Sequence, residues 1–222
     1  MGDAGMSIVL YGVGSPVVVD VEESALRAGL TIAAAVQNVP GDSLLLDAGP
    51  LVHSSALTEP EYARPFLIPL FTPGHRQAAS KEAFAAGFTT PFTLVDPTSI
   101  VARSCRLAGG VYVNSGCTIG AATRFEDFVF VNRGACIGHH VVLERFVSIG
   151  PGAVLGGQVK VGKGSLIGAG AVVLPEVQIG ENAVVGAGSV VTSDIPDRTL
   201  VLGNPARTVR SDIAGHKNLS VD

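Results

Sequence analysis

A six-residue repeat in the second half of the chain limits the fold more than any other feature of the sequence. Steps of six from Val101 to Val191 meet an aliphatic residue or Phe every time. The residues met are Val101, Leu107, Val113, Ile119, Phe125, Val131, Ile137, Leu143, Ile149, Leu155, Val161, Ile167, Val173, Ile179, Val185 and Val191. Gly often follows, as at Gly120 and Gly138, where a turn tolerates it. Because a helix would scatter residues spaced by six around its axis, the repeat predicts a parallel β-helix with three short strands and about eighteen residues per coil.

Strand alternation places the residue before each repeat position on the outside of the coil. Outward residues about eighteen apart then stack in three columns. The first column is Ile100, Thr118, Cys136, Val154, Val172 and Val190, the second is Arg106, Arg124, Val142, Lys160 and Gln178, and the third is Tyr112, Phe130, Ser148, Leu166 and Val184. The first and third columns are apolar, and apolar surfaces of that extent are rarely left in water. We therefore expect a homo-oligomer, and a closed threefold ring fits two apolar faces per chain.

The chain before residue 98 has the alternating pattern of a small Rossmann-like α/β unit with a parallel sheet. A strand that runs into a glycine turn is expected at 7–15, further strands at 30–38, 65–71 and 92–97, and helices at 16–29 and 74–87. The chain is thus expected to contain three parts: an α/β domain (1–97), the β-helix (98–191) and a C-terminal turn and tail (192–222).

A glycine turn in the first part could bind substrate. Gly12 and Gly14, followed by Ser15, lie between the first strand and the first helix, where a phosphate-binding loop belongs. The full GxGxxG motif is absent. Nucleotide binding and a purely steric turn therefore remain equal alternatives.

Composition excludes several classes of partner. The formal net charge is −4 and the pI is about 5.7, so no basic surface for nucleic acid is expected. No apolar run approaches the roughly 18 residues that cross a bilayer, and the first residues lack a signal-peptide pattern. Three cysteines without CxxC spacing fit a reducing compartment better than a disulfide framework or a zinc cluster. We expect a cytoplasmic protein without membrane or nucleic-acid partners.

Two adjacent histidines lie on a corner of the predicted coil. His139 would project between Ala121 and Gly157 of the neighbouring coils, whose small side chains leave a hollow. His140 follows it, and adjacent histidines diverge too much to hold one metal ion. The two histidines could simply be exposed to solvent on this corner, or His139 could be a catalytic base. The sequence leaves both alternatives open. Asn132 stacks on Asn114 in another corner, either as a structural amide ladder or as part of a site.

The chain resembles the hexapeptide-repeat acyltransferases, and within them the sialic acid O-acetyltransferases and bacterial nucleotide-amino-sugar N-acetyltransferases. The residues that carry the resemblance are the unbroken repeat, the segment FVNRGACIGHHVVLERFVSIGPGAVLGGQVKVGKGSLIGAGAVV at 130–173, and GNPAR at 203–207. The resemblance implies a left-handed β-helix, acetyl-CoA as co-substrate without a metal, and a sugar or nucleotide-linked sugar as acceptor.

The resemblance implies a role for each matching residue. His139 matches the family's general base, and His140 stands where the family has an acidic residue. Asn132 matches an Asn near the acceptor, and Ser148 stands where the family often has a His close to the acetyl group. Acyl-CoA would be bound by Ser148 and by the backbone at Gly157, Ala169 and Ala187, and the acceptor by Gly12, Gly14 and Ser15. Residues 203–207 match a turn near the nucleotide end of CoA.

The implied reaction is direct acetyl transfer. A neutral His139 would take a proton from an amine or hydroxyl of the acceptor as it attacks the thioester. Backbone N–H groups or the hydroxyl of Ser148 would stabilise the oxyanion. Cys105 and Cys117 face inward, and Cys136 faces outward on an apolar column, where it is expected to pack. No covalent intermediate is therefore expected.

Three other functions are alternatives to acetyl transfer to a sugar. A carbonic anhydrase on the same β-helix needs several His ligands from adjacent coils, whereas His53, His75 and His216 lie outside the coil. A non-enzymatic β-helix used for assembly and an acyltransferase for a non-sugar small molecule remain the alternatives.

Overall fold

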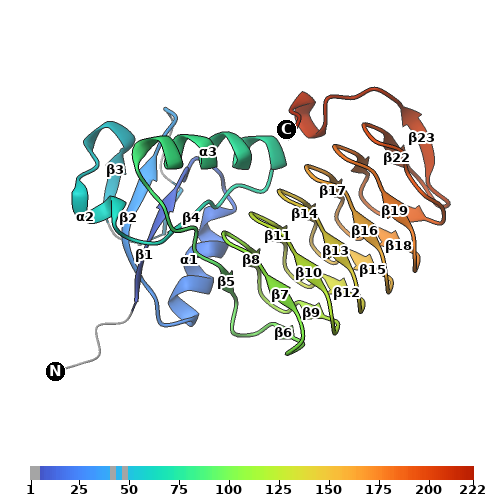
Figure 1. Cartoon of the computed structure of the whole chain (residues 1–222), viewed down its shortest axis with the longest axis horizontal. Helices are drawn as coiled ribbons and strands as arrows, with labels where there is room; N and C mark the ends of the chain where they lie inside the picture. The colour runs from blue at the N-terminus through green and yellow to red at the C-terminus, as the bar shows by residue number, and fades with distance from the viewer. Residues whose placement is uncertain (1–5, 41–43, 47–49) are drawn as a thin grey trace.

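The computed structural model describes residues 6–40, 44–46 and 50–222 as an α/β unit packed against a coil of short strands (Figure 1). The strands of the α/β unit form a parallel sheet in the order β3-β2-β1-β4. The elements are β1 (Ser7–Tyr11), α1 (Val18–Arg27), β2 (Thr31–Gln37), β3 (Leu51–His53), α2 (Glu59–Tyr62), β4 (Phe66–Leu67) and α3 (Pro73–Ala86). The strands predicted at 7–15, 30–38 and 65–71 and both predicted helices are confirmed, whereas β3 and α2 were not predicted.

The coil forms three sheets, each built from every third strand (Figure 1). The first sheet contains β6 (Ile100–Val101), β9 (Thr118–Ile119), β12 (Cys136–Ile137), β15 (Val154–Leu155), β18 (Val172–Val173) and β21 (Val190–Val191). The second contains β7 (Arg106–Leu107), β10 (Arg124–Phe125), β13 (Val142–Leu143), β16 (Lys160–Val161) and β19 (Gln178–Ile179). The third contains β5 (Leu94–Val95), β8 (Tyr112–Val113), β11 (Phe130–Val131), β14 (Ser148–Ile149), β17 (Leu166–Ile167), β20 (Val184–Val185), β22 (Leu200–Leu202) and the antiparallel β23 (Arg207–Arg210). The third sheet thus starts before residue 98 and continues past residue 191, which are the predicted bounds of the β-helix.

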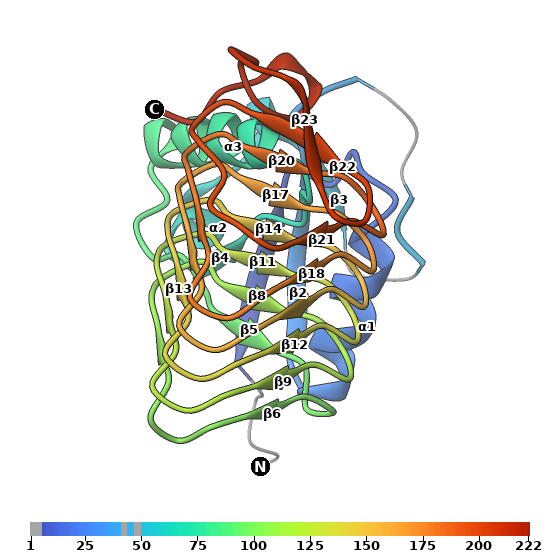
Figure 2. The ribbon, with the colours of Figure 1, turned by 90° about the vertical axis from the view of Figure 1, so that its right-hand side faces the viewer.

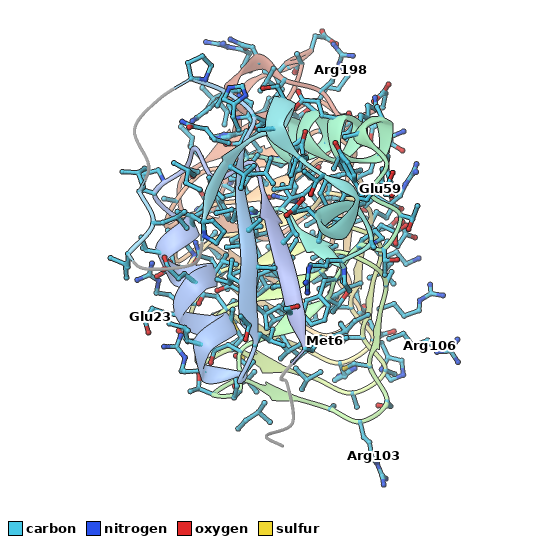
Figure 3. The ribbon with its side chains drawn as sticks, turned by 90° about the vertical axis from the view of Figure 1, so that its left-hand side faces the viewer. Met6, Glu23, Glu59, Arg103, Arg106 and Arg198 are labelled. Atoms are coloured by element: carbon cyan, nitrogen blue, oxygen red, sulfur yellow. The ribbon has the colours of Figure 1, made fainter. Side chains whose placement is uncertain are left out.

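The register of the coil confirms the predicted columns. Cys136 pairs with Val154 in the first sheet, Val142 with Lys160 in the second, and Ser148 with Leu166 in the third. Figure 2 shows the coils stacked one above another, and their inward repeat residues form one continuous core. Outward residues of the early coils, such as Arg103 and Arg106, point away from it (Figure 3).

The expectation of two open apolar faces is wrong, because the chain covers one of them itself. The α/β unit packs on the third sheet, where Tyr112 and Phe130 are buried beside α1 and β1. Farther along the same sheet, Leu166 and Val184 are buried under Ile213 of the C-terminal tail. The first sheet stays open, and the side chain of Ile100 is 70% exposed. One apolar face per chain is left for a partner.

Two buried charged side chains hold the α/β unit to the coil. The carboxylate of Asp96 accepts hydrogen bonds from Ser24 at 2.6 Å and from two nitrogens of Arg27 at 3.0 and 2.8 Å. Arg76 of α3 is 1% exposed and donates to six oxygens, among them the carbonyls of Phe128 and Phe146 on successive coils. Burial lowers the pKa of Arg76 to about 9, so the guanidinium keeps its proton at neutral pH.

In the part of the chain that the structure describes, no helix is long and apolar enough to cross a membrane.

Candidate functional site

His139 lies on the corner where β12 of the first sheet passes to β13 of the second sheet. The backbone there is fixed by neighbouring coils, because the N–H of His140 donates to the carbonyl of Ala121 and the carbonyl of His139 accepts from Gln158. His140 has a φ of +57°. Both imidazoles are exposed, and we call this corner, with His139, His140 and Gly157, the His139 edge.

The imidazole of His139 packs over Gly157 of the next coil. A Cβ built on Gly157 would lie 2.6 Å from Cε1 and 2.7 Å from Nε2 of His139. Such distances do not occur between real atoms, so the hollow predicted beside His139 exists and the imidazole occupies it. Its position depends on the absence of a side chain at residue 157.

His140 is the hydrogen-bond partner of His139. The two Nδ1 atoms are 3.1 Å apart, and the rings are inclined at 85°. Between two neutral imidazoles, one Nδ1 donates and the other accepts. In the tautomer in which His139 donates, its Nε2 keeps a lone pair and can act as a base. His140, which the resemblance aligns with an acidic residue of the family, is thus in hydrogen-bond contact with His139.

The structure does not bring Asn132 near His139 within one chain. Asn132 lies on the corner between the third and first sheets, which we call the Asn132 edge. Its Oδ1 accepts from Nδ2 of Asn114 at 3.0 Å and from the N–H of Arg133 at 2.8 Å. The amide ladder is therefore present, and Asn132 is 9% exposed.

The expectation that Ser148 reaches an acyl group is not met. Ser148 is fully buried because the α/β unit covers the third sheet at this point. Its hydroxyl donates to the carbonyl of Phe71 at 2.5 Å and accepts from Nη2 of Arg76 at 2.9 Å. With both contacts made inside the protein, this hydroxyl is not available to stabilise an oxyanion.

The residues expected to line the acyl-CoA groove fall on two edges of the coil. Gly157 lies on the His139 edge. Ala169 and Ala187 are exposed and stack on the Asn132 edge, where the N–H of Gly188 donates to the carbonyl of Ala169. Between the two edges lies the exposed first sheet, so one chain alone does not bring these residues together.

Gly12, Gly14 and Ser15 line a cavity of about 450 Å³ in the α/β unit. Its other walls come from the segment after β2, from α3 and from the C-terminal tail. They are formed by Pro16, Asn38, Val39, Leu70, Phe71, Thr72, His75, Ala78, Ala79, Glu82 and Lys217. Thr72 and His75, at the start of α3, were not singled out from the sequence. The sequence carried no signal for Lys217, which reaches the cavity from the far end of the chain.

The cavity wall beside the glycine turn contains a polar contact. Nδ2 of Asn38 donates to Oε2 of Glu82 at 2.6 Å, which links the segment after β2 to α3. Gly12 has a φ of +84°, a conformation that favours glycine, and a Cβ there would come 3.3 Å from Leu70. Glycine at residue 12 thus allows the positive φ of the turn and leaves the cavity free of a side chain at this position.

Among the described residues, no group of three or more His, Cys, Asp or Glu side chains could hold a metal ion.

Comparison with known proteins identifies the repeat and the whole fold. Residues 158–193 match the family described as bacterial transferase hexapeptide (six repeats). No curated protein sequence matches the chain. The chain is 30% identical to GDP-perosamine N-acetyltransferase from Caulobacter crescentus, with a TM-score of 0.82 over 94% of this chain and 99% of that one. That relative was crystallised with CoA and GDP-perosamine, as a histidine-to-alanine mutant and in other forms.

Two further structures are similar over nearly their whole length. The acetyltransferase domain of PglB from Neisseria gonorrhoeae FA1090, in complex with acetyl coenzyme A, is 28% identical with a TM-score of 0.81 over 92% of this chain and 100% of that one. WeeI from Acinetobacter baumannii AYE, at 20% identity, has a TM-score of 0.75 over 92% of this chain and 100% of that one, and supports the fold alone. The chain belongs to the hexapeptide-repeat acyltransferases and is an acetyltransferase.

Proposed function

We propose that this chain transfers the acetyl group of acetyl-CoA to the amino group of a nucleotide-linked sugar, with His139 as the general base. The observation that carries the proposal is the pairing of His139 with His140 on an exposed edge, in a chain that also has a cavity at Gly12 and Gly14. The relatives support the choice of substrate, since one was crystallised with GDP-perosamine and CoA and another with acetyl coenzyme A.

The proposed chemistry is a direct transfer. Nε2 of His139 takes a proton from the acceptor amine as the amine nitrogen attacks the thioester carbon. The carbon–sulfur bond breaks, an amide forms, and the CoA thiolate leaves and takes up the proton from His139. Base catalysis of this kind contributes about 10²- to 10⁴-fold to the rate. Backbone N–H groups remain the candidates for stabilising the oxyanion, because Ser148 is buried.

We further propose that the site is completed between subunits of a homotrimer. The first sheet is the apolar face that the chain leaves open, and the His139 edge and the Asn132 edge run along its two sides. Burying this face between copies would set the His139 edge of one copy beside the Asn132 edge of another. Asn132, Ala169 and Ala187 would then meet His139 and Gly157 across the interface.

Acetyl transfer to GDP-, UDP- and dTDP-linked amino sugars tests the proposal directly. Release of CoA thiol from acetyl-CoA is measured with each acceptor. The corresponding sugars that carry a hydroxyl group in place of the amino group distinguish N- from O-acetylation. We expect transfer to at least one amino sugar, and a fall in kcat of about 10²- to 10⁴-fold for His139→Ala with unchanged acetyl-CoA binding. Transfer to none of the sugars, or full activity of His139→Ala, would contradict it.

A further inference from the structure

The C-terminal tail (213–222) returns from the coil to the α/β unit, and both of its ends are anchored (Figure 1). Ile213 is 8% exposed and packs against the third sheet. Val221 is 2% exposed, and the side-chain amide of Asn182 accepts from its N–H at 2.7 Å and donates to its carbonyl at 3.0 Å. Asp222 is bonded to α3 through its backbone carbonyl and its carboxylate.

Two glycines leave room for this tail. A Cβ on Gly74 of α3 would lie 2.5 Å from Cβ of Leu219, and a Cβ on Gly164 would lie 2.6 Å from Cβ of Val221. Any side chain at either position would therefore displace the tail. The close fit at both places shows that the tail is a packed element with one defined path.

Between its anchors the tail brings Lys217 into the wall of the cavity at Gly12 and Gly14. Lys217 has a φ of +56° and the next residue, Asn218, a φ of +59°. This left-handed conformation is unfavourable for a lysine and persists only where the surroundings impose it. Within the described part of the chain, Lys217 has no carboxylate partner, so its ammonium group is free to meet a ligand.

Lys217 is the one lysine or arginine among the described residues that line the cavity. His216 lies beside Lys217. Burial, and then the charges of Lys217 and His75, lower the pKa of His216, so its imidazole is neutral at pH 7 and leaves the charge to Lys217. Among the described residues that line the cavity, Glu82 is the one carboxylate, and Asn38 already bonds it. The ammonium group of Lys217 is therefore the group in this cavity with which an anion would pair.

Two backbone features add to this preference. α3 has 14 residues and begins at the cavity, where Thr72 and His75 form part of the wall. The first N–H groups of a helix lack partners within the helix and carry partial positive charge. The turn at Gly12 and Gly14 lines the same cavity. A diphosphate, with charge on both of its phosphoryl groups, matches this combination of turn, helix N-terminus and cation.

We propose that the C-terminal tail is part of the acceptor site and that Lys217 pairs with the diphosphate of the nucleotide-linked acceptor. This inference rests on the proposed function, because it identifies which part of that acceptor the tail recognises. Lys217 acts as a binding and specificity residue and takes no part in proton transfer.

Calorimetric titration with GDP, UDP and dTDP, and with the corresponding nucleosides, tests this role without acetyl transfer. The variants are Lys217→Gln, Lys217→Arg, which keeps the charge, and Lys160→Gln, a matched control on the exposed second sheet. We expect the wild-type protein to bind at least one nucleoside diphosphate. Lys217→Gln should weaken that binding about 10-fold, whereas Lys217→Arg and Lys160→Gln stay within about 2-fold. The affinity for nucleosides should be the same in all four proteins.

Binding of no nucleoside diphosphate by the wild-type protein would overturn the inference. The inference would also be overturned if Lys217→Gln bound the nucleoside diphosphate as tightly as the wild-type protein. The same holds if Lys217→Gln lost as much affinity for nucleosides as for nucleoside diphosphates. Acetyl transfer is assayed separately on the same proteins. Diphosphate binding that depends on Lys217, without acetyl transfer to any sugar, would reject the proposed function and keep the role of Lys217. Transfer with an unchanged acceptor KM in Lys217→Gln would reject the role of Lys217 alone.

Discussion

The imidazole of His139 occupies the space that a side chain on Gly157 would need. The closest approach, between Cε1 of His139 and a Cβ built on Gly157, would be 2.6 Å. Because the two residues belong to successive coils, the spacing of the coils sets how far the imidazole projects. The bond to His140 then fixes how the ring is turned.

Gly157→Ala should displace the imidazole of His139 without unfolding the protein. The added methyl group meets a side chain and not the backbone, so we expect kcat to fall at least about 10²-fold while the melting temperature changes by less than about 3 °C. Steady-state kinetics and thermal unfolding check both parts. Gly109→Ala is the control, since a Cβ there would meet nothing closer than 3.4 Å. Unchanged kcat in Gly157→Ala would show that the position of His139 is not critical.

His140 should set the pH dependence of the reaction through its contact with His139. In His140→Asp a carboxylate replaces an imidazole at 3.1 Å from Nδ1, and a carboxylate stabilises the imidazolium form. We expect the acid limb of the kcat/KM profile to move to higher pH, because His139 then stays protonated at higher pH. His140→Asn is the matched control, since Asn also tolerates a φ of +57° but carries no charge. The same acid limb in both variants would contradict this role.

Folding stability should depend on pH through Asp96. Burial raises the pKa of this carboxyl group, but the hydrogen bonds from Arg27, Ser24 and Thr98 outweigh it and lower the pKa to about 2. A lowered pKa in the folded state means stability that is fully present above about pH 4 and lost as the pH falls towards 2. The shift corresponds to about 2 kcal/mol.

Asp96→Asn should therefore lower the free energy of unfolding by about 2 kcal/mol at pH 7 and flatten its acid dependence. Denaturant titrations between pH 2 and 7 measure both. Glu23→Gln is the control because Glu23 is the exposed partner of the same Arg27, and such pairs contribute under about 1 kcal/mol. Equal acid sensitivity of Asp96→Asn and the wild-type protein would place the titrating group elsewhere.

The coil could be predicted almost residue by residue because its pattern is local. Each inward residue, such as Ile137, and each corner residue, such as His139, is fixed by its place in a six-residue step. The hollow beside His139 could be predicted from the same six-residue spacing, since Gly157 lies one coil of eighteen residues after His139. Features that repeat with the coil are thus accessible from the sequence alone.

Contacts between distant parts of the chain could not be predicted in this way. Ser148 looked like an exposed member of an apolar column, but it is buried because the α/β unit folds onto the third sheet. Lys217 enters the cavity only because Gly74 and Gly164 let the tail pack against them. No periodic pattern signals that residues 217 and 12 line the same cavity, and the spacing of the coil carries no information about it.

The exposed first sheet should be the contact between subunits. Val154 is 39% exposed near the middle of this sheet, between the His139 edge and the Asn132 edge. Val154→Glu would bury an unpaired charge in the interface, so we expect the subunit dissociation constant to rise about 100-fold or more and acetyl transfer to fall with it. Sedimentation at micromolar concentration and CoA thiol release measure the two effects. Lys160→Glu, on the exposed second sheet, should leave assembly and transfer unchanged. A wild-type protein that sediments as a stable monomer would show instead that the first sheet is tolerated in water, and would contradict a site completed between subunits.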